Sequence, residues 1–372
     1  MLNDKEFEDL IRPIADIYNE MECELLLEVA RRFETYRNVG GSLEWYVGKL
    51  DELGGLNQDA VKIIAKYSKR SETKIKEMLS DAGYKSIPIA EFREVYKAGG
   101  TLINPDTISI ARVIENSYID AQETFKLIHT KALDGTKKAY MDVLNQAYLE
   151  VGGGYYDYNA SIQNACKKMA KQGITCATYL RNGKEVKMSI ESVVRRDTLT
   201  MANQMANKAN DKFIDDMQAK HIYVSEHMGA RNSGVAWQNH ESWQGQVYLI
   251  NGSDENYKNF ANTTGYGKVD GLAGVNCRHR HYAFFPGFSV IPKRLVDDEE
   301  NSKLYELIQK QRYYERGIRS WKKQQAIYEG LEDNINIVRC KKKVKEWQSN
   351  LQTFIDHHDE LKRDYSREKV YS

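Results

Sequence analysis

The sequence predicts an α+β protein made mainly of long α-helices, with one small mixed α/β or β-rich compact domain and a helical C-terminal tail. Apolar residues recur every three or four positions through the first two hundred residues, the period of an amphipathic helix. Only five prolines occur in 372 residues, so long helices meet few interruptions. The composition changes at residues 221–292, where Gly, Trp, His and Asn surround short apolar runs.

The first region, residues 1–220, is predicted to be helical. Its opening stripe contains eight apolar side chains at helical spacing: Phe7, Leu10, Ile14, Ile17, Met21, Leu25, Val29 and Phe33. Gly54-Gly55 is expected to break the helical pattern, and Ser71 has the character of an N-cap for a following helix. A further long helical stretch is expected to be interrupted near Asp134-Gly135.

A β-hairpin is predicted near residues 178–188, within this helical region. Asn182-Gly183 lies between two extended runs, and both residues tolerate a positive φ, which a two-residue hairpin turn requires. Ser189 then has the position of a cap for another long helix.

The second region, residues 221–292, is predicted to be a compact domain. HIYVSE, QVYLI and HYAFF are its three candidate strands. Below about 80 residues a core rarely supplies more than a few kcal/mol, so a staple, or docking onto the helices, is expected.

The third region, residues 293–372, is predicted to be a helical tail that forms a hairpin or pair of long helices. Its apolar residues, among them Ile318, Trp321, Trp347 and Leu351, follow helical spacing. The basic run RCKKKVKEW at 339–347 is typical of a solvated helix face, and contact with phosphate is the alternative.

Composition excludes several classes of protein. With 54 basic and 53 acidic residues the net charge is +1, so no global field draws the chain to nucleic acid or membrane. The sequence contains no run of 18 apolar residues, so no membrane span is predicted. The charged, helical N-terminus is unlike a secretory signal. The five cysteines are odd in number and scattered, which is not a disulfide framework and suits a reducing cytoplasm.

Four side chains of the compact domain are candidate metal ligands: His227, His240, Cys277 and His279. Cys277 and His279 are two residues apart, so on an extended segment they project from the same face and can reach one ion. His227 and His240 come from the earlier loop. A tetrahedral CysHis₃ zinc site would staple the two ends of a domain that is too small to be stable by burial alone.

Three alternatives to this zinc site stay open at the level of sequence. The histidines can be hydrogen-bonded polar groups of a small core, with Cys277 a buried apolar residue. His281 shares the strand face and can replace His279 as a ligand. Cys277 with a histidine partner can also be a nucleophile, in a nuclease or ADP-ribosyltransferase-like toxin domain at 221–292. However, no Ser-His-Asp set, paired-carboxylate spacing or phosphate loop is visible, so the protein is predicted not to be an enzyme.

A set of short motifs stands in order in this domain: His227-Met228-Gly229-Ala230-Arg231, His240, Trp243-Gln244-Gly245, Gly265-Tyr266-Gly267, Gly274 to His279, and Pro286-Gly287. This ordered set resembles the minor capsid proteins of tailed bacteriophages, which are encoded next to the portal protein. The upstream helical half and the tail stretch YYERGIRSWKK fit the same family. Related head-morphogenesis proteins carry a CxxC and a Cys-rich segment in the comparable domain. By analogy His227 and His240 stand where their first two cysteines stand.

The resemblance implies a structural component of the virion, made in the host cytoplasm and placed near the portal vertex. It implies a role in head assembly or DNA ejection, with the portal protein and other capsid proteins as partners and several copies in each virion. Contact with packaged DNA is expected to be weak and non-specific, and contact with membranes is not expected.

Overall fold

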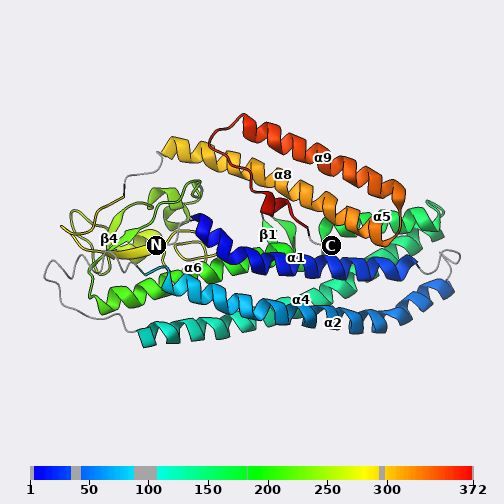
Figure 1. The fold of residues 1–372 in the computed structure, drawn as a ribbon, viewed down its shortest axis with the longest axis horizontal. Coiled ribbons are helices and arrows are strands. Elements are labelled where there is room, and N and C mark those ends of the chain that lie inside the picture. The colour runs from blue at the N-terminus through cyan, green and yellow to red at the C-terminus, as the bar shows by residue number, and fades with distance from the viewer. Residues whose placement is uncertain (1–3, 35–42, 88–106, 182, 293–297, 371–372) are drawn as a thin grey trace. The chain divides into compact units, whose positions relative to one another are not determined.

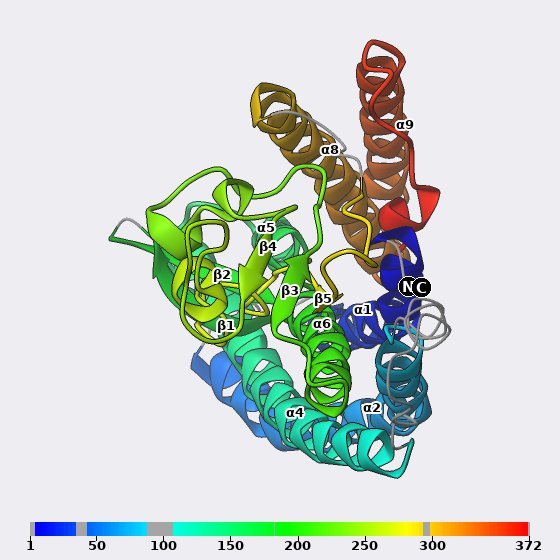
Figure 2. The ribbon, with the colours of Figure 1, turned by 90° about the vertical axis from the view of Figure 1, so that its left-hand side faces the viewer.

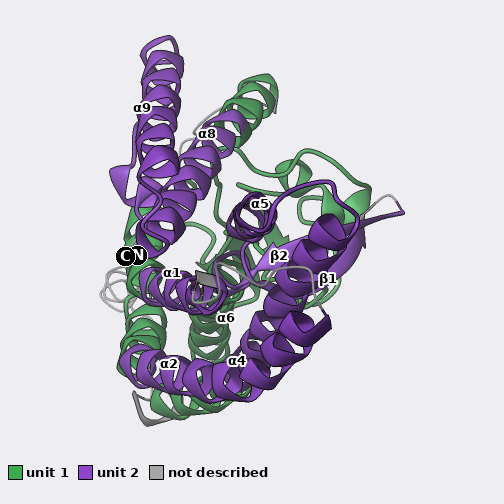
Figure 3. Cartoon of the chain, turned by 90° about the vertical axis from the view of Figure 1, so that its right-hand side faces the viewer, with its two compact units in different colours: residues 1–13, 73–123, 195–309 green, residues 14–72, 124–194, 310–372 purple. Residues whose placement is uncertain are grey.

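The computed structural model describes residues 4–34, 43–87, 107–181, 183–292 and 298–370. The chain forms two compact units, each assembled from three separated segments (Figure 3). Unit 1 comprises Met1–Pro13, Thr73–Glu123 and Arg195–Gln309, and unit 2 comprises Ile14–Glu72, Thr124–Val194 and Lys310–Ser372. The expected division into consecutive domains at 1–220, 221–292 and 293–372 concerns independent folding and stays a prediction.

Eight helices make up most of the described chain (Figure 1). They are α1 (Asp4–Glu34), α2 (Leu43–Tyr84), α4 (Thr107–Gly152), α5 (Tyr158–Gln172), α6 (Ile190–Asp216), α7 (Phe260–Thr264), α8 (Asp298–Gly330) and α9 (Asn334–Asp356). Two small antiparallel sheets complete the fold, so the prediction of a mainly helical α+β protein is confirmed. None of the described helices is long and apolar enough to cross a membrane.

The first helices are longer than their glycines and caps suggested. α2 runs through Gly54-Gly55 and Ser71 over 42 residues, so the predicted break and N-cap are both wrong. α4 likewise continues through Asp134-Gly135 over 46 residues, and the expected interruption is absent there. A glycine inside a helix costs only about 1 kcal/mol, which tertiary packing readily outweighs. Gly55 packs closely, since a Cβ on it would lie 3.2 Å from Arg32 Nη1.

The apolar stripe of α1 lies in the core of unit 2 from Ile14 onward, where Ile14, Met21, Leu25 and Val29 are fully buried. Tyr18, on the same helix, places its hydroxyl 2.7 Å from His129 Nε2 on α4 and 3.3 Å from Ser71 Oγ on α2. Burial lowers the pKa of His129, which favours the neutral imidazole as an acceptor for the Tyr18 hydroxyl. One buried polar contact therefore joins three helices.

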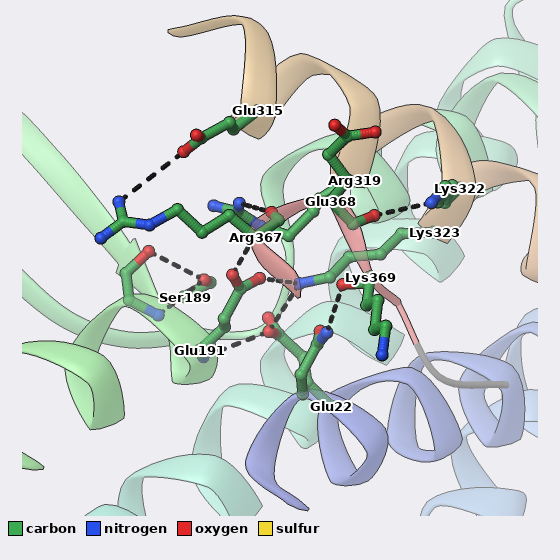
Figure 4. Close-up of polar contacts among 12 residues, drawn as sticks. Glu22, Ser189, Glu191, Glu315, Arg319, Lys322, Lys323, Arg367, Glu368 and Lys369 are labelled. Atoms are coloured by element: carbon green, nitrogen blue, oxygen red, sulfur yellow. Dashed lines mark hydrogen bonds and ion pairs between the residues drawn. The ribbon is translucent and has the colours of Figure 1, made fainter. Parts of the chain in front are cut away.

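A buried ion-pair cluster links α1 to α6 and α8 in unit 2, and Figure 4 shows its contacts. Lys323 on α8 lies 2.9 Å from Glu22 Oε2 on α1 and 2.8 Å from Glu191 Oε2 on α6. Arg319 Nε lies 2.7 Å from the other oxygen of Glu191. Burial alone would favour a neutral amine, but the two carboxylates outweigh it and raise the pKa of Lys323. We call these four residues the Glu22 cluster.

The carboxylate of Glu22 also accepts two backbone N–H groups. They belong to Ile174, at 2.9 Å, and to Glu191 in the first turn of α6, at 3.2 Å. The positive end of a helix dipole stabilises a carboxylate at that position. The cluster therefore combines ion pairs with main-chain hydrogen bonds.

The C-terminal segment of the described chain is held beside the same cluster (Figure 4). Arg319 donates to the carbonyl oxygen of Arg367, and Lys322 donates to that of Glu368 at 2.8 Å. Glu368 itself is buried and accepts from Arg363 at 2.7 Å. Cationic side chains of α8 thus satisfy carbonyl groups that would otherwise need water.

The predicted hairpin is confirmed. β1 (Thr175–Arg181) pairs antiparallel with β2 (Lys184–Ser189), and Arg181 faces Lys184 at the turn. Gly183 has the expected positive φ of 73°, whereas Asn182 lies outside the described residues.

The helical tail is confirmed as a pair of antiparallel-running long helices, α8 and α9, joined by a short turn. Ile318, Val344 and Leu351 form its buried core, with Trp321 and Trp347 packed beside them. The helices touch so closely at Gly317 that a Cβ there would lie 2.1 Å from the ring of Trp347. The lysines of the basic run lie mainly on the exposed face of α9.

Unit 1 contains the three strands predicted for the compact domain. β3 (His221–Val224) lies between β4 (Val247–Leu249) and β5 (His281–Phe284), and both pairings are antiparallel (Figure 2). α6 lies beside β5, where the side chain of Asn207 accepts the N–H of His281 at 3.0 Å. The long loops between these short strands carry the candidate ligands.

Candidate metal centre

Three of the four predicted ligands lie together inside unit 1. His240, Cys277 and His279 are buried, and one potential ligand atom from each lies within 4.8 Å of the others. His240 begins the short 3₁₀ turn His240–Ser242, while Cys277 and His279 lie on the segment that leads into β5. Residues almost 40 positions apart in the chain therefore meet.

Cys277 and His279 lie before β5 rather than within it. The segment is nevertheless tied to the extension of β3, since the Ser225 N–H donates to the Arg280 carbonyl oxygen at 2.8 Å. The Arg280 N–H donates in turn to Ser225 Oγ at 2.9 Å. The alternation expected from the sequence survives, and His279 Nδ1 lies 3.7 Å from Cys277 Sγ.

Glycine allows the preceding loop to fold tightly enough to deliver Cys277. A Cβ on Gly271 would lie 2.2 Å from the Gly265 carbonyl oxygen, a distance that no other residue tolerates. The GLAG stretch, residues 271–274, thus serves the close packing of one backbone segment on another. The Cys277 N–H closes the loop by donating to the Gly274 carbonyl oxygen at 3.1 Å.

Gln244 fixes the protonation of His279. Its Oε1 accepts the backbone N–H of His227 at 2.8 Å, and because an N–H can only donate, this contact defines which end of the amide is oxygen. His279 Nε2 lies 2.9 Å from the same Oε1 and must therefore carry the proton. The lone pair of His279 is then on Nδ1, the nitrogen that faces Cys277.

His240 is oriented in the same way by a backbone group. Its Nε2 lies 3.0 Å from the carbonyl oxygen of Asp270, which can only accept, so the proton is on Nε2. Its Nδ1 faces Cys277 Sγ at 4.0 Å. Both histidines thus present an unprotonated Nδ1 to one sulfur atom.

Burial dominates the electrostatics of this group. It raises the pKa of Cys277 to about 11, against the opposing effects of backbone hydrogen bonds and of Arg231 and Arg280. It lowers the pKa of His240 to about 4. Without a cation these shifts favour a thiol at Cys277 and a neutral imidazole at His240. Cys277 is 1% exposed, and burial favours its protonated thiol when no cation is bound, which argues against the nucleophile alternative.

His227, the fourth predicted ligand, lies next to this group but outside it. Its ring is half-buried and packs edge-on against His279, with ring centroids 5.9 Å apart. Its backbone shares Gln244 Oε1 with His279. The structure therefore brings three predicted ligands together and places the fourth beside them.

His281, which the sequence offered as an alternative ligand to His279, has a different partner. Its Nε2 lies 2.7 Å from Asp211 Oδ1 on α6, and the Tyr266 hydroxyl donates to Asp211 Oδ2 at 2.5 Å. Because β5 turns His281 toward α6, it does not join His240 and Cys277. Of the two candidates, His279 is the one near Cys277.

Sequence reasoning missed the residues that position the group. On α6, Asn203 and Asn207 are buried, and both donate to the carbonyl oxygen of His279, at 3.2 and 3.3 Å. Gln244 stands out in the sequence only as a member of the Trp243-Gln244-Gly245 motif. The available signal was the i, i+4 spacing of the asparagines, which places them on one face of a helix.

The HMGAR stretch is anchored on α8. Asn301 Oδ1 accepts the N–H groups of Gly229, at 2.8 Å, and Ala230, at 3.1 Å, and its Nδ2 donates to the Ala230 carbonyl oxygen at 3.2 Å. Trp243 lies under the rings of the group, with centroids 4.6 Å from His240 and 4.9 Å from His279. The motifs seen in the sequence therefore surround one buried centre.

The order of these motifs, the long helices around them and the buried His-Cys-His centre fit the structural capsid proteins that the motifs resemble. The chain belongs to the phage minor capsid protein 2 family, whose model matches residues 2–356. It is similar to a structural protein of Lactococcus phage LL-H, at 22% identity over 88% of this chain and 89% of the relative. A structural protein of Lactococcus phage mv4 is 32% identical over 28% of this chain and 86% of the relative. No solved structure is significantly similar.

These matches confirm the resemblance found in the sequence. The protein is a phage minor capsid protein and a structural component of the virion. The family match extends over helices of both units and over the loops of the buried centre.

Proposed function

We propose that this minor capsid protein acts at the portal vertex, in head assembly or DNA ejection, and contacts the portal protein through its helical unit 2. The observation that carries the proposal is a set of large apolar side chains left open on that unit. Leu149 near the end of α4 and Tyr155 just after it are 68% and 77% exposed, and Leu180 on the hairpin is 75% exposed. Exposed apolar groups on a virion protein are favourable sites for contact with another chain.

A groove lies next to these side chains and supports the same surface. It encloses about 730 Å³ between α4, α5 and the hairpin, and Leu149, Lys168, Met169 and Lys187 are among its lining residues. Apolar and acidic side chains, such as Leu149 and Glu150, line the groove together with lysines. Such a mixed lining suits a protein segment better than a phosphate backbone, which needs cationic contacts throughout. We propose a portal segment, rather than DNA, as its partner.

Capsid assembly in the presence of variants tests this role. Phage carrying Leu149→Asp and Leu180→Asp together should release heads with several-fold fewer copies of this chain per portal, measured by quantitative mass spectrometry. Val290→Asp is the matched control, because Val290 is 87% exposed but belongs to unit 1. Equal incorporation of the unit 2 variant, with loss in the control, would overturn the proposed surface.

Localisation within the particle tests the vertex itself. Cross-linking mass spectrometry on purified virions should recover cross-links between unit 2 and the portal protein. Cross-links spread evenly over major capsid positions would place the chain away from the vertex. Assays of purified protein on nucleic acid and on NAD test the enzyme alternative, for which turnover should be absent.

A further inference from the structure

We propose that unit 1 binds one structural zinc ion through His240 Nδ1, Cys277 Sγ and His279 Nδ1, with His227 as the fourth ligand. This inference goes beyond the portal role, because it concerns how unit 1 is held together and not where the protein acts. It stands on the geometry and hydrogen bonding of three buried side chains.

The hydrogen-bond chemistry of the site favours a cation over a thiol proton. The two Nδ1 atoms face the same sulfur, at 3.7 and 4.0 Å, and both are acceptors because their rings carry the proton on Nε2. A thiol has a single proton and can serve only one of two nitrogens. A metal cation, by contrast, can bind the deprotonated sulfur and the lone pairs of both nitrogens at once.

The distances fit a tetrahedral ion. Zinc bonds of about 2.3 Å to sulfur and about 2.0–2.1 Å to nitrogen, at tetrahedral angles, separate sulfur from nitrogen by about 3.6 Å. The observed separations of 3.7 and 4.0 Å need closure by less than half an ångström. All three ligand atoms lie within 4.8 Å of one another, close enough for one ion to be shared.

The surrounding groups hold the rings as metal sites require. A histidine ligand usually donates its second N–H to a carbonyl or amide oxygen, which sets its tautomer and direction. His240 does so to the Asp270 carbonyl and His279 does so to Gln244. The α6 asparagines that donate to the His279 carbonyl fix its backbone as well.

His227 is the side chain placed to close the site. Its backbone is bound to Gln244, the residue that orients His279, and its ring already contacts the His279 ring at a centroid separation of 5.9 Å. To serve as the fourth ligand, His227 would have to turn its ring toward the centre. Three imidazoles and one thiolate form a borderline-soft tetrahedral set, which favours zinc over magnesium or calcium.

The ion would cross-link the loops of unit 1. It joins the segment after β3, the 3₁₀ turn at His240 and the segment before β5, all of which have little regular structure. In the unfolded chain these ligands are far apart, so binding free energy contributes directly to folding.

The primary test is the metal content of the full-length protein, purified without a metal-affinity step and dialysed against zinc-free buffer. Inductively coupled plasma mass spectrometry should find one zinc ion per chain. The protein should release it to a chelator with a fall in melting temperature. Absence of stoichiometric zinc, both as purified and after incubation with zinc sulfate followed by gel filtration, would overturn the proposal.

Two variants separate the site from general effects of cysteine loss. Cys277→Ser should reduce bound zinc to background, whereas Cys340→Ser, in which an equally buried thiol of α9 is changed, should retain one equivalent. His227→Ala should lower zinc affinity while leaving the other three ligands, and unchanged affinity would remove His227 from the set.

Cobalt gives a readout that does not depend on stability. Wild-type protein loaded with Co²⁺ should show the absorption of a tetrahedral ion together with a thiolate-to-cobalt charge-transfer band. Cys340→Ser should keep that band. A cobalt spectrum of octahedral type, without the thiolate band in wild-type protein, would contradict the ligand set even where Cys277→Ser fails to fold.

Discussion

Glu22 on α1 and Lys323 on α8 form an ion pair of 2.9 Å in which both side chains are withdrawn from water, at 0% and 7% exposure. Lys323 is the bridge of the Glu22 cluster, because Glu191 binds the same ammonium group. A single cation therefore compensates two buried carboxylates, with Arg319 contributing at the edge.

Replacing Lys323 should strongly destabilise the fold. Lys323→Met leaves Glu22 and Glu191 facing each other without a bridging charge, and breaking a buried pair costs about 3–5 kcal/mol. Urea unfolding followed by circular dichroism measures the loss. Lys303→Met removes an exposed pair with Glu299 and should cost at most about 1 kcal/mol. Similar midpoints for the two variants would mean that the Glu22 cluster contributes little.

Gly317 should not accept a side chain. Gly317→Ala would place a Cβ 2.1 Å from the Trp347 ring and force α8 and α9 apart. Overpacking of this kind costs roughly 1–3 kcal/mol, visible as a lower melting temperature. In α2, Gly48 has nothing within 4 Å of its Cβ position, so Gly48→Ala should raise stability by up to about 1 kcal/mol. A stabilised Gly317→Ala protein would disprove the close helix contact.

Acid should destabilise unit 2 through His129. Burial lowers its pKa from 6.5, so the unfolded chain takes up this proton first as pH falls. Its contribution to stability is therefore present above about pH 6.5 and is lost as pH falls through the folded pKa. His129→Gln should lose less stability than wild type between neutral pH and pH 5. The exposed His357→Gln should follow wild type, and identical pH profiles for all three proteins would exclude this effect.

DNA binding should be weak and should change little with salt. The basic run on α9 is partly neutralised, since Lys343 lies 2.8 Å from Glu346 and Lys341 lies 4.0 Å from Glu329. Filter-binding titrations across salt concentrations should give a shallow slope. A loss of roughly a thousandfold between 50 and 200 mM salt, as expected for about six or more phosphate contacts, would refute this expectation.

Gln244 should act on the proposed zinc site without binding the ion. Gln244→Leu removes the acceptor that orients His279, and losses of about 10–100-fold in metal affinity are typical for such partners. Competition with a chromogenic chelator measures the affinity. Gln246→Leu changes an exposed neighbour and should leave affinity unchanged. Equal affinities for both variants would remove Gln244 from the site.

Local patterns predicted most of the elements. The three-and-four spacing of α1, the Asn182-Gly183 turn of the hairpin and the short apolar runs HIYVSE, QVYLI and HYAFF each depend on neighbours in sequence. The helix breaks predicted at glycines in α2 and α4 were wrong. A penalty of about 1 kcal/mol per glycine is smaller than the free energy that a long helix gains from packing.

The candidate centre divides in the same way. The proximity of Cys277 and His279 is predictable because their two-residue spacing is local. His240 was included on the expectation of a metal staple, and its approach to Cys277 depends on the fold of the loops. The sequence could not separate His279 from His281, since both share that spacing, and only the packing of β5 on α6 assigns His281 to Asp211.

By itself, the sequence determined the mainly helical α+β class, the hairpin, the strands and the family, because each is written in short-range periodicity or in ordered motifs. Tertiary structure alone decided which distant side chains meet. Glu22, Glu191 and Lys323 have no shared local pattern, and neither do Gln244 and His279, yet both sets are joined inside a core. Burial removes water as a hydrogen-bonding partner, so these polar groups need partners within the protein. The backbone path that brings those partners together is a property of the whole fold.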